Sequence, residues 1–182
     1  MTERENPRQG TIWSCDPHTR AKHRVLRRYL QAWFPILLSG WDSVTYAEGF
    51  AGPGVYEGGE PGSPVIASRT LFEHEGIRGT GKTVNLVFVE ERRDRMDHLR
   101  QQIRRELEQH GPSAKVVPRV RFAEGACDEV LPAALAQAGS LGRPVFAFLD
   151  SFGGPDIPFT LLERLAGNPS SEVLVTFGTR PF

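Results

Sequence analysis

The stretch VTYAEGFAGPG, residues 44–54, decides the fold that we expect for this chain. Its first half is typical of a strand, and the strand ends in an acid, Glu48, just before a Gly-x-Gly turn. Gly52 and Gly54 lack a Cβ, so the backbone can turn sharply and approach a ligand closely. The carboxylate of Glu48 can accept a hydrogen bond from an ammonium or hydroxyl group of that ligand. This order favours a nucleotide-like ligand site, and a tight strand-to-helix turn is the alternative.

Acids also follow the next two predicted strands. Residues 84–90, VNLVFVE, form a nearly continuous apolar run that ends in Glu90, as in a strand buried on both faces of a parallel sheet. We expect Glu90 to accept from both hydroxyls of a ribose, or alternatively to cap the next helix. Asp128 follows the third strand, where it would lie near an adenine amine or serve as an ordinary helix cap.

A fourth strand, VFAFLD at residues 145–150, runs into Ser151, Phe152 and two glycines. An acid, a small residue, an aromatic and a turn at a strand end resemble motif IV of amino-methylating enzymes. In those enzymes a carboxylate or amide holds the target amine and the aromatic ring stacks on the base. The resemblance makes Asp150 and Phe152 the candidate catalytic residues. The alternative for Asp150 is a structural acid that accepts from backbone donors in the glycine-rich turn.

Helical patterns alternate with these strands. Asp16 before Pro17 predicts a capped helix start, and Ser63 before Pro64 predicts a second one in the same manner. The expected helices are 17–38, a helix from 63, 92–110, 128–138 and 159–166, and the further strands are 116–122, near an edge, and 172–177. This alternation predicts an α/β fold with a Rossmann-like, doubly wound, mainly parallel sheet. The carboxyl ends of its strands, with Glu48, Glu90 and Asp150, should then converge on one rim.

The acid-x-Phe-x-Gly-x-Gly pattern resembles motif I of S-adenosylmethionine-dependent methyltransferases. Over about residues 13 to 180 the chain is also similar to the three-Cys-motif partner protein family. The matching segments are His18-Thr19, Lys22-His23, Tyr29-Leu30, Ala32-Trp33, Gly49-Phe50-Ala51-Gly52-Pro53-Gly54, Gly59-Glu60-Pro61-Gly62-Ser63-Pro64, Phe148-Leu149-Asp150-Ser151-Phe152-Gly153 and Val173-Leu174-Val175. In the family, Asp is common where this chain has Glu48, and Pro is common where it has Ser151. The absence of that proline removes a fixed φ from the loop.

The resemblance implies a methyltransferase-like fold with S-adenosylmethionine as cofactor. Glu48 and the backbone of Phe50, Ala51, Gly52, Pro53 and Gly54 would hold its methionine part, Glu90 its ribose, and Asp128 would lie near its adenine. Asp150 would accept from the exocyclic amine of a nucleobase in DNA or RNA. The alternative is a non-catalytic partner of a radical-S-adenosylmethionine-like protein with a three-cysteine motif. Methyltransferase sheets normally have seven strands, so we expect this chain to lack the last two.

Length and composition fit one domain, residues 17–182, after a polar lead-in at residues 1–16 that we expect to be flexible. The chain has 22 basic and 22 acidic residues, so its overall charge does not call for a nucleic acid partner. Its two cysteines, Cys15 and Cys127, are too few for a metal framework. Without a long apolar run or a signal core, we expect a cytoplasmic protein with no membrane partner.

Basic residues gather in two segments, residues 20–28 and 92–105. Such runs are most often solvated helix faces, and phosphate contact is the alternative. His18, Thr19 and Lys22 share one helical face, which indicates either a lid over the site or an ordinary helix start.

Residues 76–83, GIRGTGKT, fit the phosphate-loop pattern. That motif needs a strand before it and a helix after it, so that amides and a helix dipole point at phosphate. Here a helical segment leads in and the strand from Val84 leads out. We therefore expect no nucleotide hydrolysis at this loop.

Overall fold

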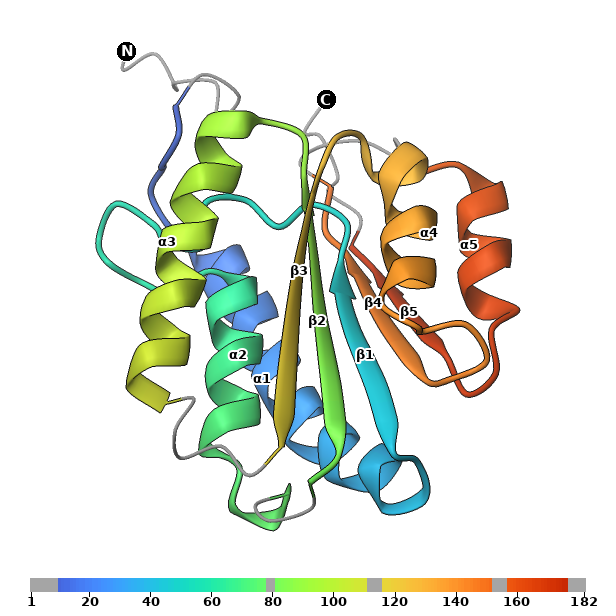
Figure 1. The fold of residues 1–182 in the computed structure, drawn as a ribbon. Helices are drawn as coiled ribbons and strands as arrows, with labels where there is room; N and C mark the ends of the chain where they lie inside the picture. Colours follow the sequence, from blue (N-terminus) through green and yellow to red (C-terminus); the bar gives the residue numbers. More distant parts are fainter. Residues whose placement is uncertain (1–9, 78–80, 111–115, 152–156, 177–182) are drawn as a thin grey trace.

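The computed structural model describes residues 10–77, 81–110, 116–151 and 157–176, which form a parallel five-stranded sheet of order β3-β2-β1-β4-β5 (Figure 1). The strands are β1 (Ser43–Glu48), β2 (Thr83–Glu90), β3 (Val117–Glu124), β4 (Val145–Leu149) and β5 (Glu172–Val175). The Rossmann-like α/β fold expected from the sequence is confirmed. Because the chain reverses direction across the sheet between β1 and β4, the carboxyl ends there form the natural ligand crevice of such a sheet.

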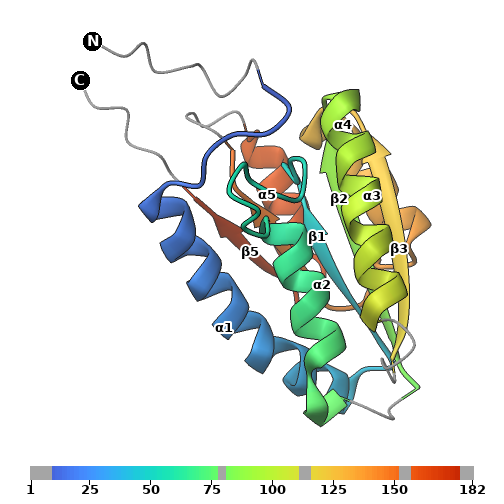
Figure 2. The ribbon, with the colours of Figure 1, turned by 90° about the vertical axis from the view of Figure 1, so that its left-hand side faces the viewer.

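Helices cover both faces of the sheet, and a short 3₁₀ helix, η1, joins α2 to β2. The helices are α1 (Pro17–Gly40), α2 (Ser63–Glu73), η1 (Glu75–Ile77), α3 (Arg93–His110), α4 (Cys127–Gln137) and α5 (Phe159–Ala166). Figures 1 and 2 show α1, α2 and α3 side by side on one face, with α4 and α5 on the other. None of the helices in these described ranges combines the length and hydropathy needed to cross a bilayer.

The two helix starts predicted from Pro positions differ in their caps. Asp16 caps α1 as expected, because its Oδ1 accepts from the amide of Thr19 at 2.7 Å. The cap predicted at Ser63 is wrong. Gly62 is the N-cap of α2 without a side-chain bond, and the Ser63 hydroxyl instead donates to Glu48 at 2.7 Å. A buried carboxylate is the more demanding acceptor, so it takes the hydroxyl that would otherwise cap the helix.

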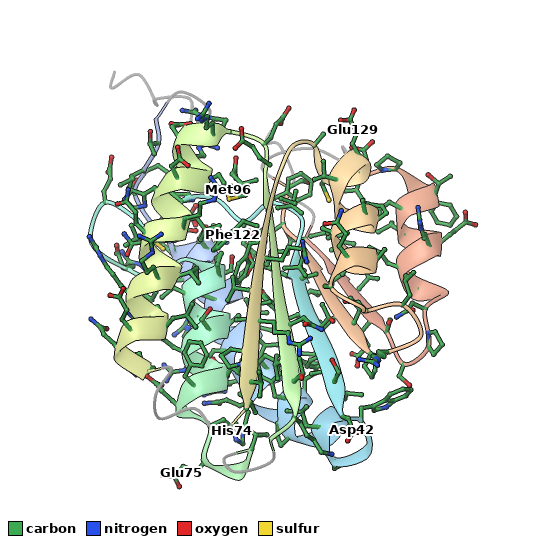
Figure 3. All side chains as sticks on the ribbon, in the orientation of Figure 1. Asp42, His74, Glu75, Met96, Phe122 and Glu129 are labelled. Atoms are coloured by element: carbon green, nitrogen blue, oxygen red, sulfur yellow. The ribbon has the colours of Figure 1, made fainter. Side chains whose placement is uncertain are left out.

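Side chains of the central strands alternate between two apolar clusters. Tyr46 and Phe88 face the α1–α3 side, whereas Ala47 and Val87 face the α4–α5 side, and all four are fully buried. Ala47 belongs to the same apolar cluster as Leu131 of α4 and Leu161 of α5. Met96, also fully buried, points from α3 towards the sheet in Figure 3. Burial of both faces explains why the strand sequences are nearly continuous apolar runs.

The phosphate-loop pattern lies at the opposite end of the sheet from the carboxyl ends of the strands. In Figure 3, Asp42, His74 and Glu75 mark this lower end, and Glu129 marks the upper end. As expected, a helix, α2, leads into the segment and a strand, β2, leads out of it; η1 includes its first two residues, and residues 78–80 lie outside the described part of the chain. Lys82 donates to the carbonyl of Leu38 at 2.5 Å, so it caps the end of α1.

Candidate functional site

A cavity of about 440 Å³ lies across the carboxyl ends of the first four strands. We call it the rim cavity, and it is lined by Gly49, Phe50, Glu90, Glu91, Arg92, Arg95, Gly125, Ala126, Cys127, Asp128 and Ser151. Its volume falls in the range of small-molecule sites, about 300–1,000 Å³. Residues that follow four different strands meet here only because the strands are parallel. Of the three acids expected to converge on one rim, Glu90 lines this cavity, whereas Glu48 and Asp150 are not among its lining residues.

Glu90 is one of three acids on the wall of the rim cavity, with Glu91 and Asp128, and only 7% of its surface is exposed. Its Oε2 accepts from the amide of Gly52 at 2.9 Å, and its Oε1 accepts from the amide of Arg92 at 2.9 Å. A carboxylate has about four acceptor positions. The two amides therefore fix the orientation of Glu90 and leave one acceptor position on each oxygen.

Gly49 brings the floor of the rim cavity close to α4 and β4. A Cβ at this position would lie 2.4 Å from the Sγ of Cys127 and 2.7 Å from a methyl of Leu149. Gly52 and Gly54 have φ values of +64° and +83°, which side chains rarely adopt. The glycine loop therefore depends on glycine for close packing at Gly49 and for backbone conformation at the other two positions.

Glu48 lies behind the rim cavity rather than on its wall. It is 1% exposed, and its two oxygens accept from the Tyr46 hydroxyl at 2.6 Å and the Ser63 hydroxyl at 2.7 Å. Burial raises the pKa of Glu48 to about 8, because the two hydroxyl bonds only partly offset the loss of water. The hydroxyl donors at this carboxylate thus come from the protein itself.

Asp150 lines a second hollow of about 20 Å³, which shares Phe50 with the lining of the rim cavity. We call it the glycine-loop pocket, and its lining is Trp13, His23, Phe50, Ala51, Gly52, Pro53, Gly54, Val55, Tyr56, Gly62, Ser63 and Asp150. Lys22 donates to both oxygens of Asp150, at 2.8 and 2.6 Å, and the Thr176 hydroxyl donates to Oδ1. The partners of Asp150 are therefore side chains from distant segments. Phe152, the predicted stacking aromatic, lies outside the described residues.

His23 adds a neutral ring to the same pocket. Burial lowers the pKa of His23 to about 4, with Asp150 opposing this and Lys22 adding to it. Its ring centroid lies 5.7 Å from that of Tyr56. Above about pH 5 this side chain is therefore an uncharged aromatic surface beside the Asp150 carboxylate.

The segment at residues 10–16 connects both hollows. Trp13 meets the Tyr56 ring edge-on at 5.8 Å, and its carbonyl accepts from the amide of Glu57 at 3.0 Å. The guanidinium of Arg95 lies 4.7 Å from the centre of the Trp13 ring, and Arg95 also donates to the carbonyl of Gly10 at 2.9 Å. This part of the expected lead-in packs against α3 and the glycine loop.

Lys22, His23, Tyr56, Trp13 and Arg95 were not predicted as site residues. Lys22 and His23 stood in the segment that resembles the family, and the helical face that Lys22 shares with His18 and Thr19 indicated a lid. Trp13 gave a weaker signal, as a large aromatic in an otherwise polar segment. In the described ranges, no group of three or more His, Cys, Asp or Glu side chains is suited to hold a metal.

Comparisons of the chain with protein-family models, with curated proteins and with solved structures found no match. The fold and the site geometry therefore carry the functional argument.

Proposed function

We propose that this chain binds S-adenosylmethionine in the rim cavity and is a methyltransferase of the three-Cys-motif partner type that N-methylates a nucleobase. The carrying observation is the Glu90 carboxylate, fixed by two amides at the wall of a cavity of about 440 Å³. One free acceptor position on each oxygen suits the two neighbouring hydroxyls of a ribose.

The surrounding residues are consistent with the other parts of this cofactor. The missing Cβ at Gly49 and the turn at Phe50 keep backbone at the cavity wall for the methionine part. Asp128, in the first turn of α4, also lines the cavity and is suited to accept from an adenine amine. Glu48 would act from behind, by holding Ser63 at the start of α2. The cofactor, when bound, supplies a methyl group on a sulfonium, which is already a good leaving group.

Asp150 is the proposed acceptor for the substrate amine. Lys22 makes two contacts with its oxygens and Thr176 makes one, which leaves one of about four acceptor positions. A single N–H of an exocyclic amine would take that position. The neutral ring of His23 and the ring of Tyr56 line the same pocket, and this pocket of about 20 Å³ would have to widen before a base could stack on either ring. The rate enhancement would come from holding amine and methyl group in line.

Calorimetry with S-adenosylmethionine tests the cofactor assignment. Glu90→Gln should weaken binding by about 1–3 kcal/mol, or roughly 5- to 150-fold, because a ribose hydroxyl loses its acceptor. Glu124→Gln is the matched control, since Glu124 stands beside Glu90 in the sheet register and does not line the cavity. Thermal unfolding checks that each variant is folded.

A second measurement needs no variant. Wild-type protein should bind adenosine at least about tenfold more tightly than 2′,3′-dideoxyadenosine, which lacks both hydroxyls. Equal affinity for the two nucleosides, with unchanged binding in Glu90→Gln, would overturn the assignment.

A non-catalytic partner of a three-Cys-motif radical-S-adenosylmethionine-like protein is the second candidate. The double contact of Lys22 with Asp150 favours it, because this ion pair already occupies the carboxylate that a substrate amine needs. Radiolabelled methyl transfer to total RNA and DNA separates the two proposals. A wild-type protein that binds the cofactor but incorporates no label supports the non-catalytic partner.

A further inference from the structure

Helix α1 carries an unusual charge pattern on its surface. Its 24 residues include five arginine and lysine residues and no aspartate or glutamate. The chain as a whole has a formal net charge of zero, so this excess is local. Arg20, Arg24 and Arg28 follow one another at intervals of four, and all three are exposed. They therefore form one row along the helix, about 12 Å long at 1.5 Å per residue. We call it the arginine row.

Like charges at intervals of four residues repel one another and destabilise a helix. Arg20 has a partner, since it pairs with Glu60 at 3.0 Å. Among the described residues, no ion pair or side-chain hydrogen bond involves Arg24 or Arg28. The nearby Arg27 reaches Glu73 at 3.6 Å, with both side chains about half exposed. Two adjacent guanidinium groups in this row are thus left for an external anion.

The other arginine-rich helix, α3, shows the contrasting arrangement. Acids are interleaved with its arginines, and Asp97 pairs with Arg100 at 2.8 Å and with Arg93 at 4.0 Å. Glu106 pairs with Arg69 from α2 at 2.7 Å. The five arginines of α3 are therefore nearly balanced by four acids on the same helix, although no ion pair among the described residues involves Arg104 or Arg105. The two basic segments of the sequence have different environments.

The arginine row begins at the site. Arg20 pairs with Glu60, and the backbone of Glu60 closes the loop that carries Tyr56, since its carbonyl accepts from the Tyr56 amide at 2.9 Å. Lys22, two residues further along α1, contacts Asp150 at 2.6 Å. Lys22 projects from nearly the opposite side of α1, because residues two apart do not share a helix face. An anionic chain lying on Arg28 and Arg24 would instead pass Arg20 and reach the Tyr56 loop, which lines the glycine-loop pocket together with Asp150.

We propose that the arginine row binds the phosphate backbone of a single-stranded nucleic acid and directs a base to Asp150. This rests on the proposed function, for which it supplies the docking surface. A base must leave its stack before its exocyclic amine can enter an enclosed site, which favours a single strand. Single strands are usually held by basic side chains that follow the phosphate backbone, together with aromatic rings on which bases stack.

Fluorescence anisotropy with a labelled RNA of about 12 nucleotides tests the proposal, without cofactor present. The double variant Arg24→Gln, Arg28→Gln should bind at least about tenfold more weakly at low salt. The slope of log K against log salt should also fall by about 1.4, since each lost phosphate contact removes about 0.7 for a single strand. The matched control, Arg93→Gln with Arg105→Gln on α3, removes the same charge and should change affinity less than about twofold.

Single-stranded DNA, a duplex of the same sequence and polyglutamate are the comparison ligands. Tighter binding of single-stranded RNA or DNA than of the duplex and polyglutamate supports the proposal. Whichever of RNA and DNA binds more tightly identifies the preferred sugar. Equal binding of polyglutamate would mean a surface for an acidic protein and would overturn it. Equal losses in the α1 and α3 variants would also overturn it. The Arg24→Gln, Arg28→Gln variant should bind S-adenosylmethionine with wild-type affinity, because neither residue lines the rim cavity. Failure of this surface and failure of the cofactor assignment therefore give different results.

Discussion

Replacing Glu48 with Gln should change how the stability of the protein depends on pH. Burial raises the pKa of this carboxyl from 4.5 to about 8. An acid with a higher pKa in the folded than in the unfolded chain holds its proton more tightly when folded. Its contribution to stability is thus present below about pH 4.5 and is lost as the pH rises through about 8. At about 1.4 kcal/mol per pH unit, the whole loss is on the order of 5 kcal/mol.

The side-chain amide introduced by Glu48→Gln can still accept from the Tyr46 hydroxyl and can donate to the Ser63 hydroxyl, so the packing should survive. His23 acts in the opposite direction: its lowered pKa of about 4 gives stability that is present above about pH 6.5 and lost as the pH falls through 4. This histidine is the same in both proteins, and its effect therefore cancels in a comparison of wild type with variant.

Urea unfolding followed by tryptophan fluorescence, at about pH 5.5 and about pH 8.0, measures the effect. Between these values the wild type should lose about 3 kcal/mol more unfolding free energy than Glu48→Gln. Glu124→Gln, on the exposed end of β3, is the control and should follow the wild type. Identical pH dependence in wild type and Glu48→Gln would refute the reasoning, because it would mean that Glu48 stays ionised in its buried position.

Three further predictions concern other positions. Lys82→Met should lower the free energy of unfolding by about 1 kcal/mol, because the Leu38 carbonyl loses its donor. Calorimetry should detect no ATP binding to the wild-type protein, and therefore no loss of ATP binding in the variant. Gly49→Ala should lower both the melting temperature and the affinity for S-adenosylmethionine, because the new Cβ would overlap Cys127 and move the cavity wall. Asp150→Asn should reduce methyl transfer to nucleic acid at least about 100-fold with cofactor affinity changed only a few-fold; an equal loss of both would contradict a role confined to the acceptor.

The sheet was predictable from the sequence because burial on both faces leaves long apolar runs, and each run has a visible end. Glu90 is the clearest case: the acid marks where β2 stops, and parallel topology then places it on the rim. The helix at residues 159–166 was predicted with the observed bounds. Caps were less predictable. At Ser63 the local rule for helix starts was overridden by Glu48, whose burial is a property of the folded chain and has no local signal.

Contacts between distant segments were beyond such reasoning. Lys22 and Asp150 are 128 residues apart, and their contact depends on how α1 crosses the sheet. Nothing in a helix sequence specifies that crossing. The same holds for Trp13, whose position depends on Arg95 of α3 and on the glycine loop. Asp150 could therefore be predicted from its place at a strand end, whereas Lys22 could not be predicted as its partner.

The glycine loop gives the two halves of the site a shared backbone. On one side, the amide of Gly52 donates to Glu90 in the rim cavity. On the other, the same loop lines the pocket that contains Asp150 and Tyr56. Trp13 rests against Gly52, where an added Cβ would lie 3.4 Å from its ring, and also against Tyr56. A ligand that tightens the bonds of Glu90 should therefore also restrict the loop that shapes the Asp150 pocket. Coupling of this kind requires only that binding at each site depends on how well ordered the same loop is. Cofactor and nucleic acid should accordingly bind more tightly together than separately, and by the same factor in either order.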